Sequence, residues 1–308
     1  MLAGPYIRGI VEEHYVKPLL DAFARGKGVD EARKNGRRRV VEAVLSSRDL
    51  GRALEASQEL ARELVEAQAE ALEAYGFSVA CAEFVLLAPG LVGTGSGVME
   101  SVFEVGLEID PVLGLPYYPA STVKGASRAA CEDLAGGGVC EVLYGSTGSA
   151  SPLVFTPAYP VGCLEDLGPC TVYWGDVITP HYYRGGRAVE SELDAEPNPV
   201  VHLSIAQGTV FKMCMGLDAS RQEVKEAVAE LLNAIRRRGE AGKRLASFGP
   251  IGASLFFTLS ALYTGFAARS AKGYNIARIL SKGEAERVSR SVVRLDLRLG
   301  GGGAGGQA

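Results

Sequence analysis

The sequence predicts an α+β fold in which a helical N-terminal region precedes a domain of strands and helices. Three observations support this prediction. Apolar residues recur at three- and four-residue spacing up to about residue 75, the apolar period shortens from residue 77, and helix-like segments then interrupt strand-like ones. With 308 residues, 47% of them hydrophobic, the chain is long enough to bury a sizeable core in one large or two smaller domains.

The N-terminal region, residues 1–76, is predicted to be helical from about residue 7 to residue 75. Most apolar residues between Val40 and Leu72 fall three or four positions apart among glutamates and arginines. Gly76 ends the pattern. We expect this amphipathic region to pack on the rest of the chain or on a partner protein.

The second region, residues 77–299, is predicted to alternate between strands and helices. Strands are expected at 77–87, 153–159, 171–178, 200–205, 210–217, 276–280 and 292–299, and helices at 121–134, 220–238 and 254–263. The order strand, helix, strands, helix, strand is that of a ferredoxin-like (RRM-like) α+β domain. Residues 300–308 are glycine-rich and are expected to be disordered.

Composition favours a cytoplasmic protein without membrane contact. The formal net charge of −4 argues against a protein that coats nucleic acid indiscriminately, since such proteins carry a strong basic excess. The basic runs at 37–39 and 236–238 neighbour acidic residues at helical spacing and are interpreted as solvated helix faces. No secretory signal is expected at the N-terminus. Residues 245–268 lack charge, but Pro250 and three glycines favour a buried turn and core helix over a membrane span.

Six cysteines occur without any Cys-x-x-Cys motif, and the three histidines are scattered. This spacing does not predict a zinc site, and no metal or other cofactor is expected. Free buried thiols are the default in a reducing cytoplasm. Intracellular proteins of hyperthermophiles are an exception, in which a pair such as Cys163 and Cys170 forms a disulfide.

An anion-binding corner is predicted at residues 114–128. Two prolines stiffen the approach to a helix start, where Ser121 or Thr122 is expected to cap the first turn. Unpaired backbone N–H groups at such a start attract phosphate. Lys124 and Arg128, at i and i+4, lie on one helix face. The alternative is an ordinary capped helix with two solvated cations.

A second candidate lies at residues 264–275, a loop of small residues after a long uncharged stretch. Its glycines allow a polyanion to approach the main chain closely, and its tyrosine is placed to stack on a base. The predicted RNA-binding residues in this loop are Gly265, Arg269, Ser270, Lys272, Gly273 and Tyr274. The alternative is a helix C-cap followed by a turn into a last strand.

Taken together, the two motifs resemble the RAMP superfamily, the repeat-associated RNA-binding proteins of CRISPR effector complexes. Residues 114–125 are similar to the family's Gly-x-Pro-x-x-Pro-Gly-Ser-Ser-hydrophobic-Lys-Gly helix start, and residues 264–275 to its C-terminal glycine-rich loop. Residues 172–182 and 197–200 resemble the type III-B (Cmr) members, so that the resemblance covers roughly residues 77 to 280. Departures from the family pattern are the non-glycine residues Ala120, Ala267 and Asn275.

The resemblance implies a non-catalytic RNA-binding subunit that caps the backbone filament of a Cmr complex. Its implied partners are the CRISPR guide RNA, toward its 3′ side, the target RNA and other Cmr RAMP subunits. Contacts to phosphate, sugar and stacked bases suit a guide whose sequence varies. The long insertion at residues 179–199 would form a thumb-like loop, with His181, Tyr182 and Arg184 as stacking and phosphate-binding groups. A surface loop without a partner is the alternative.

Catalysis is not expected. The family's cleaving subunit carries an aspartate in the loop after the first strand, whereas residues 91–101 contain only Glu100 as an acidic residue. The alternative function is a metal-independent RAMP endoribonuclease that processes CRISPR RNA. In that case His181 would be the general base and Lys124 would stabilise the phosphorane.

Overall fold

A computed structural model describes residues 2–93, 102–103, 107–179, 183–184, 187–188, 190–191 and 199–288. The N-terminal region is helical, as predicted, and contains one π-helical turn between its first two α-helices. Its elements are α1 (Gly4–Val11), the π-helix η1 (Glu12–Val16), α2 (Lys17–Ala24), α3 (Val29–Ser46) and α4 (Arg48–Ala74). Ser47 caps α4 by accepting a hydrogen bond from the Leu50 backbone N–H.

A five-stranded antiparallel sheet forms the centre of the following domain. The strand β8 pairs with β1 along one edge and with both β2 and β3 along the other, and β9 extends the sheet beyond β1. The bounds are β1 (Ser78–Leu86), β2 (Leu153–Phe155), β3 (Tyr159–Cys163), β8 (Thr209–Leu217) and β9 (Ala277–Ile279).

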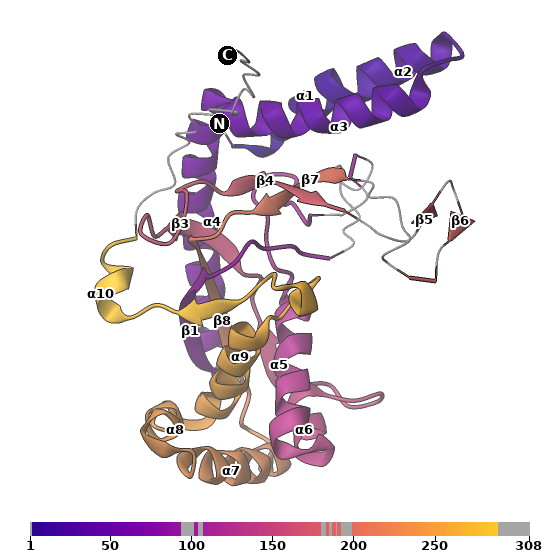
Figure 1. Cartoon of the computed structure of the whole chain (residues 1–308). Coiled ribbons are helices and arrows are strands. Elements are labelled where there is room, and N and C mark those ends of the chain that lie inside the picture. The colour runs from indigo at the N-terminus through magenta and orange to yellow at the C-terminus, as the bar shows by residue number, and fades with distance from the viewer. Residues whose placement is uncertain are drawn as a thin grey trace, which may run out of the picture.

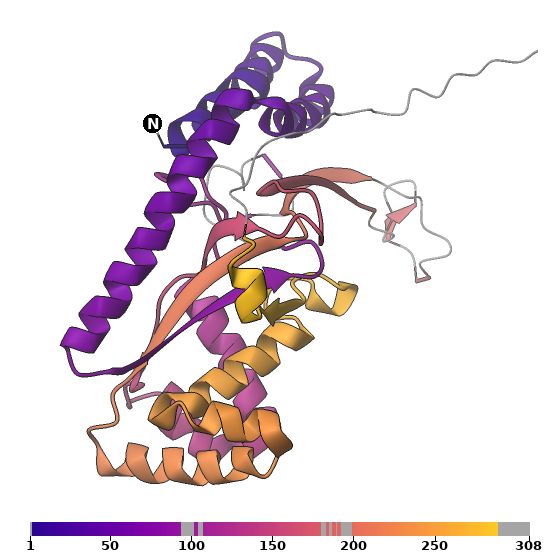
Figure 2. The same ribbon diagram turned by 90° about the vertical axis from the view of Figure 1, so that its left-hand side faces the viewer.

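Helices cover both faces of this sheet (Figures 1 and 2). The long helix α4 lies along one face and contacts β1, β3 and β8. Helices α5 to α9 lie on the side of the other face, and α5 and α9 pack against each other. The bounds are α5 (Ala120–Ala135), α6 (Gly137–Tyr144), α7 (Gln222–Arg236), α8 (Gly239–Ala246), η3 (Gly249–Ile251) and α9 (Gly252–Thr264), followed by η4 (Ser270–Lys272) and α10 (Lys282–Ala285). One hydrophobic cluster joins the N-terminal helices to the sheet.

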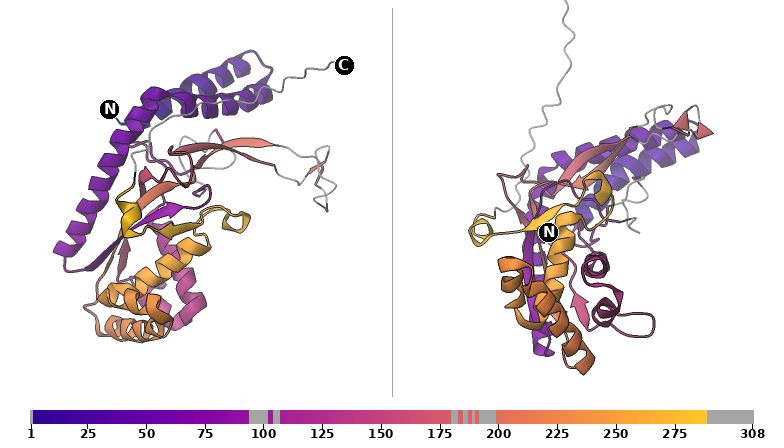
Figure 3. Two further views of the ribbon diagram at one scale, coloured as in Figure 1. Left: turned by 60° about the vertical axis from the view of Figure 1, so that its left-hand side comes forward. Right: turned by 60° about the horizontal axis from the view of Figure 1, so that its bottom comes forward.

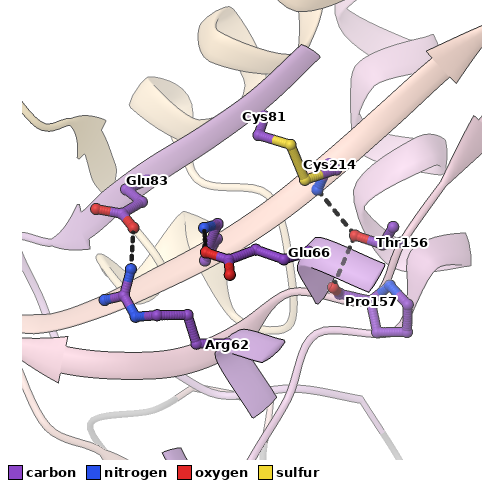
Figure 4. Close-up of a disulfide and its surroundings, with 8 residues drawn as sticks. Arg62, Glu66, Cys81, Glu83, Thr156, Pro157 and Cys214 are labelled. Carbon is purple, nitrogen blue, oxygen red and sulfur yellow. Dashed lines mark hydrogen bonds and ion pairs between the residues drawn. A yellow bond between two sulfur atoms is a disulfide. The ribbon is translucent and has the colours of Figure 1, made fainter. Parts of the chain in front are cut away.

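Ion pairs and a disulfide reinforce the α4 face of the sheet (Figure 4). Arg62 of α4 contacts Glu83 of β1 at 2.6 Å, and Glu66 of α4 pairs with Lys212 of β8. Cys81 and Cys214 face each other across β1 and β8 and form a disulfide. Because directly opposed residues are the closest pairs between two antiparallel strands, this register suits a covalent bond.

A separate two-stranded ribbon projects from the domain (Figure 3). It pairs β4 (Tyr173–Ile178) with β7 (Val200–Ile205), and the short hairpin β5 (Tyr183–Arg184) and β6 (Arg187–Ala188) lies in the segment between them. Helix α3 packs on the ribbon: a Cβ added at Gly175 would lie 3.0 Å from Val41 and 3.1 Å from Leu45.

Several sequence-based expectations need correction. All six cysteines are paired, as Cys81–Cys214, Cys131–Cys140 and Cys163–Cys170, so the default of free thiols is wrong. Helices α6, α8 and α10 were not predicted, and the strand expected at 153–159 is divided into β2 and β3. The strand expected at 292–299 and the tail at 300–308 lie outside the described residues. The domain boundary at residue 76 stays a prediction.

The uncharged stretch 245–268 contains the end of α8, the turn η3 and the 13-residue helix α9, as the expected turn and core helix require. No helix in the part of the chain that the structure describes is long and apolar enough to cross a membrane.

Candidate nucleic-acid interface

Asn275 brings the two predicted motifs together. Its side-chain Oδ1 accepts hydrogen bonds of 2.8 Å from the Tyr118 hydroxyl and from the Leu91 backbone N–H, and its Nδ2 donates to the Ala268 carbonyl at 2.6 Å. The residue is fully buried and has φ of +59°. A single side chain therefore joins the glycine-rich loop, the segment after β1 and the approach to α5.

Asparagine also explains how this loop tolerates the loss of a glycine. Asparagine adopts positive φ more readily than most residues, so the backbone keeps the turn that glycine would allow. The loop also has Arg269 at φ of +61° and Gly273 at φ of +88°. Ala267, the other departure from the glycine pattern, packs against the hydrophobic core.

Helix α5 begins one residue earlier than predicted and without a side-chain cap. Pro119 occupies the N-cap position, and neither Ser121 nor Thr122 caps the helix, which corrects the predicted capping role. The Pro119 carbonyl accepts the N–H groups of Thr122 and Val123. Proline has no N–H, and Ser121 is exposed at the first turn. In this first turn, only the backbone N–H groups of Ala120 and Ser121 therefore have no acceptor within the helix.

The two predicted cations on α5 have partners within the chain. Lys124 Nζ donates to the Leu153 carbonyl at 3.0 Å, and partial burial lowers the pKa of this amine. Arg128 pairs with Glu132 at 2.7 Å and donates to the Gly145 carbonyl. Both side chains therefore help to fix α5 against its neighbours, whether or not they also meet a phosphate.

Gly125 is exposed in the second turn of α5, and a Cβ added there would meet no atom within 4 Å. Glycine in a helix interior costs about 1 kcal/mol relative to alanine. Packing against the described residues does not require a glycine at position 125, whereas Val41 and Leu45 of α3 leave little room for a side chain at Gly175.

The glycine-rich loop supplies exposed cations. Arg269 and Lys272 are exposed, and neither forms an ion pair with another described residue. Ser270 opens the short helix η4, and Gly273 ends it. Gly265, at φ of +94°, would place a Cβ only 2.7 Å from Ser270, so that close packing and backbone conformation both require glycine there.

Tyr274 connects this loop to the ribbon. Its hydroxyl donates to Asp176 of β4 at 2.6 Å, and burial, reinforced by that carboxylate, raises the pKa of Tyr274 to about 12. Asp176 pairs in register with His202 of β7, whose ring is fully buried. Burial lowers the pKa of His202 and favours its neutral form.

Trp174, the only tryptophan, lies two residues before Asp176 and hence on the same face of β4. Its side chain is 38% exposed. An exposed indole on a ribbon beside a basic loop is suited to stacking on a base. Sequence reasoning used Trp174 only for the family resemblance and missed it as a site residue, although an exposed aromatic in a strand was a usable signal.

The structure describes little of the three residues predicted for the thumb-like loop. His181 and Tyr182 lie outside the described residues, and Arg184 belongs to β5, of which only the backbone is described. Their roles stay predictions. Within the described ranges, no group of three or more histidine, cysteine, aspartate or glutamate side chains is placed to hold a metal ion.

Comparison with known proteins identifies the family. The sequence profile of the RAMP superfamily matches residues 83–255, more than half of the chain. The chain belongs to the RAMP superfamily. The match begins in β1, includes the α5 motif and ends in the first turn of α9, so the glycine-rich loop lies outside it.

This RAMP protein is similar to the CMR subunit Cmr6 of the Saccharolobus solfataricus CRISPR system. The two are 30% identical over 187 residues, which are 61% of this chain and 60% of the relative. It is also similar to a chain in the cryo-EM structure of the type III-B Cmr-beta complex bound to cognate target RNA. That likeness has a TM-score of 0.57 at 28% identity and covers 82% of this chain and 74% of the other. Both likenesses agree with the type III-B resemblance of residues 172–182 and 197–200.

Proposed function

We propose that this RAMP protein is a non-catalytic RNA-binding subunit of a type III-B CRISPR effector complex. It would cap the backbone filament, hold the guide RNA toward its 3′ side and contact target RNA and neighbouring RAMP subunits. The sheet order and the inserted ribbon support a ferredoxin-like RAMP domain with a thumb-like loop. The similarity to Cmr6 supports the choice of complex.

The observation that carries the proposal is the junction at Asn275. It holds the exposed cations of the loop, Arg269 and Lys272, close to the uncapped start of α5. Backbone donors and cations together suit a phosphate chain and carry no sequence information. The open space over Gly125 fits this role because a phosphodiester can approach the helix backbone where no Cβ intervenes.

The first test reverses the loop charges in Arg269→Glu/Lys272→Glu. Both side chains are exposed, so the fold should be retained, and affinity for single-stranded RNA should fall at least about tenfold for every sequence. Because two cations no longer neutralise phosphates, the slope of log K against log salt should decrease by about 1.4. Binding should be measured for the purified protein and for the complex reconstituted with the other subunits of its source organism. Unchanged affinity and slope in both would contradict the proposal.

The second test uses glycine. Gly125→Gln should favour helix α5, because glutamine is a better helix former, but should weaken RNA binding by blocking the approach to the backbone. Gly9→Gln on α1 is the matched control, since Gly9 is also exposed with no atom near the added Cβ. A denaturing gel of the same RNA, with and without EDTA, checks the absence of cleavage. RNA cut despite EDTA, and left intact by His181→Ala, would favour the endoribonuclease instead.

A further inference from the structure

The arm formed by residues 16–35 contains no buried residue. It comprises α2, the turn after it and the first two turns of α3, and it begins after the last buried residue of η1, Tyr15. The next buried residue is Gly36, which packs on the Tyr15 ring. Figure 1 shows α2 and the start of α3 extending away from the sheet as a helical pair, and Figure 3 shows the same from two other sides.

Helix α2 packs only Leu19 against the core of its own chain and turns its other large apolar residues away from it. The side of α2 that faces α3 lines a groove shared by the two helices. Its lining residues are Pro18, Asp21, Ala22 and the C-cap residue Arg25, of which two are charged. Val16, Leu20 and Phe23 follow one another at i, i+4 and i+7, on the opposite side of the helix. Leu20 is 61% and Phe23 55% exposed.

This orientation reverses the usual amphipathic pattern. A surface helix normally turns its apolar stripe toward its own core, whereas α2 presents the stripe of Val16, Leu20 and Phe23 to solvent. Contiguous apolar stripes of this kind mark contact surfaces for other proteins. A phosphate backbone would gain nothing from the stripe, so its presence favours a protein over a nucleic acid.

The charge of the arm indicates the chemistry of the partner. Residues 16–35 contain five lysines and arginines and three acidic residues, a net charge of +2, in a chain whose formal net charge is −4. Four of the cations lie around the tip and on the start of α3: Arg25, Lys27, Arg33 and Lys34. An acidic surface beside an apolar seam would complement the arm.

We propose that the arm is a docking surface for a neighbouring subunit. The arm packs against a helix of that subunit, and this helix has an apolar stripe and acidic flanks. Packing of the two stripes would bury Leu20 and Phe23, and the cations at the tip would face the acidic flanks. This inference rests on the proposed function and adds to it the surface through which the subunit holds a protein neighbour.

The test compares two pairs of exposed apolar residues in the reconstituted complex. Leu20→Glu/Phe23→Glu alters the arm, and the matched control Leu60→Glu/Leu64→Glu alters an exposed pair at i, i+4 on α4. The readouts are the fraction of complexes that contain this subunit, the melting temperature of the isolated subunit and its affinity for single-stranded RNA.

We expect the arm variant to lose at least tenfold in incorporation, while its melting temperature and RNA affinity match those of the unaltered protein. The α4 variant should incorporate normally. Arg25→Glu/Lys27→Glu should weaken incorporation as well, more at low salt than at high salt.

Four results would overturn the inference. Normal incorporation of the arm variant would show that the arm is not a docking surface, and the proposed function would stand. Equal loss in the α4 variant would indicate a general effect of surface charge. Loss of RNA affinity with intact assembly would make the arm an RNA contact instead. If the unaltered protein itself failed to join the complex, the proposed function and this inference would both be wrong.

Discussion

At the scale of single residues, Asn275 determines how the candidate interface is assembled. Its amide makes three hydrogen bonds to segments up to 184 residues away, and the residue is fully buried. Buried polar groups that lose a partner are costly because the remaining donor or acceptor stays unsatisfied. The residue therefore stabilises the fold and the interface at the same time.

Asn275→Ala should lower the free energy of unfolding by about 2–4 kcal/mol, because it leaves the buried hydrogen-bond partners unsatisfied and places alanine at positive φ. Denaturant titration measures this value. Asn275→Gly keeps the backbone conformation but not the hydrogen bonds, and separates the two causes. A change below about 0.5 kcal/mol in both variants would contradict this account of the junction.

At the scale of elements, the glycine-rich loop is held between two separate structures. Asn275 anchors it to the approach to α5, and the preceding residue, Tyr274, anchors it to the ribbon through Asp176. The ribbon is in turn fixed to α3 by close packing at Gly175. The position of the N-terminal helices is thereby coupled to that of the loop cations.

Tyr274→Phe should reveal the ribbon contact through its pH dependence. The pKa of the hydroxyl rises from 10 in the unfolded chain to about 12 in the folded protein, so its contribution to stability is complete below pH 10 and is lost as pH rises through about 12. The stability difference between the native protein and Tyr274→Phe should therefore shrink between pH 10 and pH 12.

The control for this titration is Tyr263→Phe, which alters a tyrosine that is 69% exposed. Both variants retain the buried tyrosines. The control therefore measures the loss of stability that those tyrosines cause at high pH, and this loss can be subtracted. Parallel curves for Tyr274→Phe and the unaltered protein across this range would disprove the contact.

At the scale of the whole molecule, three disulfides constrain the chain very unequally. Cys81–Cys214 closes a loop with a sequence separation of 133, whereas Cys131–Cys140 and Cys163–Cys170 span separations of 9 and 7. In the chain-entropy account, longer loops gain more stability from closure. The bond between β1 and β8 should accordingly dominate.

Replacing both cysteines of one pair by serine should lower the unfolding free energy by about 5 kcal/mol for Cys81–Cys214 and by about 2–3 kcal/mol for either short loop. Calorimetry of the three double variants, with the fully reduced protein for comparison, ranks the three disulfides by their contribution to stability. Equal losses, or the largest loss at Cys163–Cys170, would show that loop closure is not the source of the stability.

The predictable parts of this protein are those specified by local pattern. The helical spacing before Gly76 and the apolar runs that became β1, β4, β7 and β8 needed only their own residues. Helices α6 and α8 begin beside glycines, which resemble turn signals, and both are only eight residues long. Short helices of this kind are stabilised by tertiary packing more than by their own residues.

The site was predicted as two segments but not as one surface. Sequence motifs indicated the start of α5 and the glycine-rich loop, whereas their junction at Asn275 depends on a contact across 157 residues to Tyr118. The pairing of Cys81 with Cys214 likewise follows from strand register, which no local pattern contains. Lys124 was predicted as a phosphate ligand without any sign that the Leu153 carbonyl would lie within its reach.

The outer strand β3 has a further consequence for assembly. Pro160 lacks an N–H group, and the pairing of β3 with β8 shifts register between Pro160 and Gly162. A strand with a proline and a bulge is a poor template for another strand. At the opposite edge, β9 offers only three residues. Sideways growth of the sheet from one copy of this chain to the next is therefore disfavoured, which protects the protein from forming β-aggregates with itself.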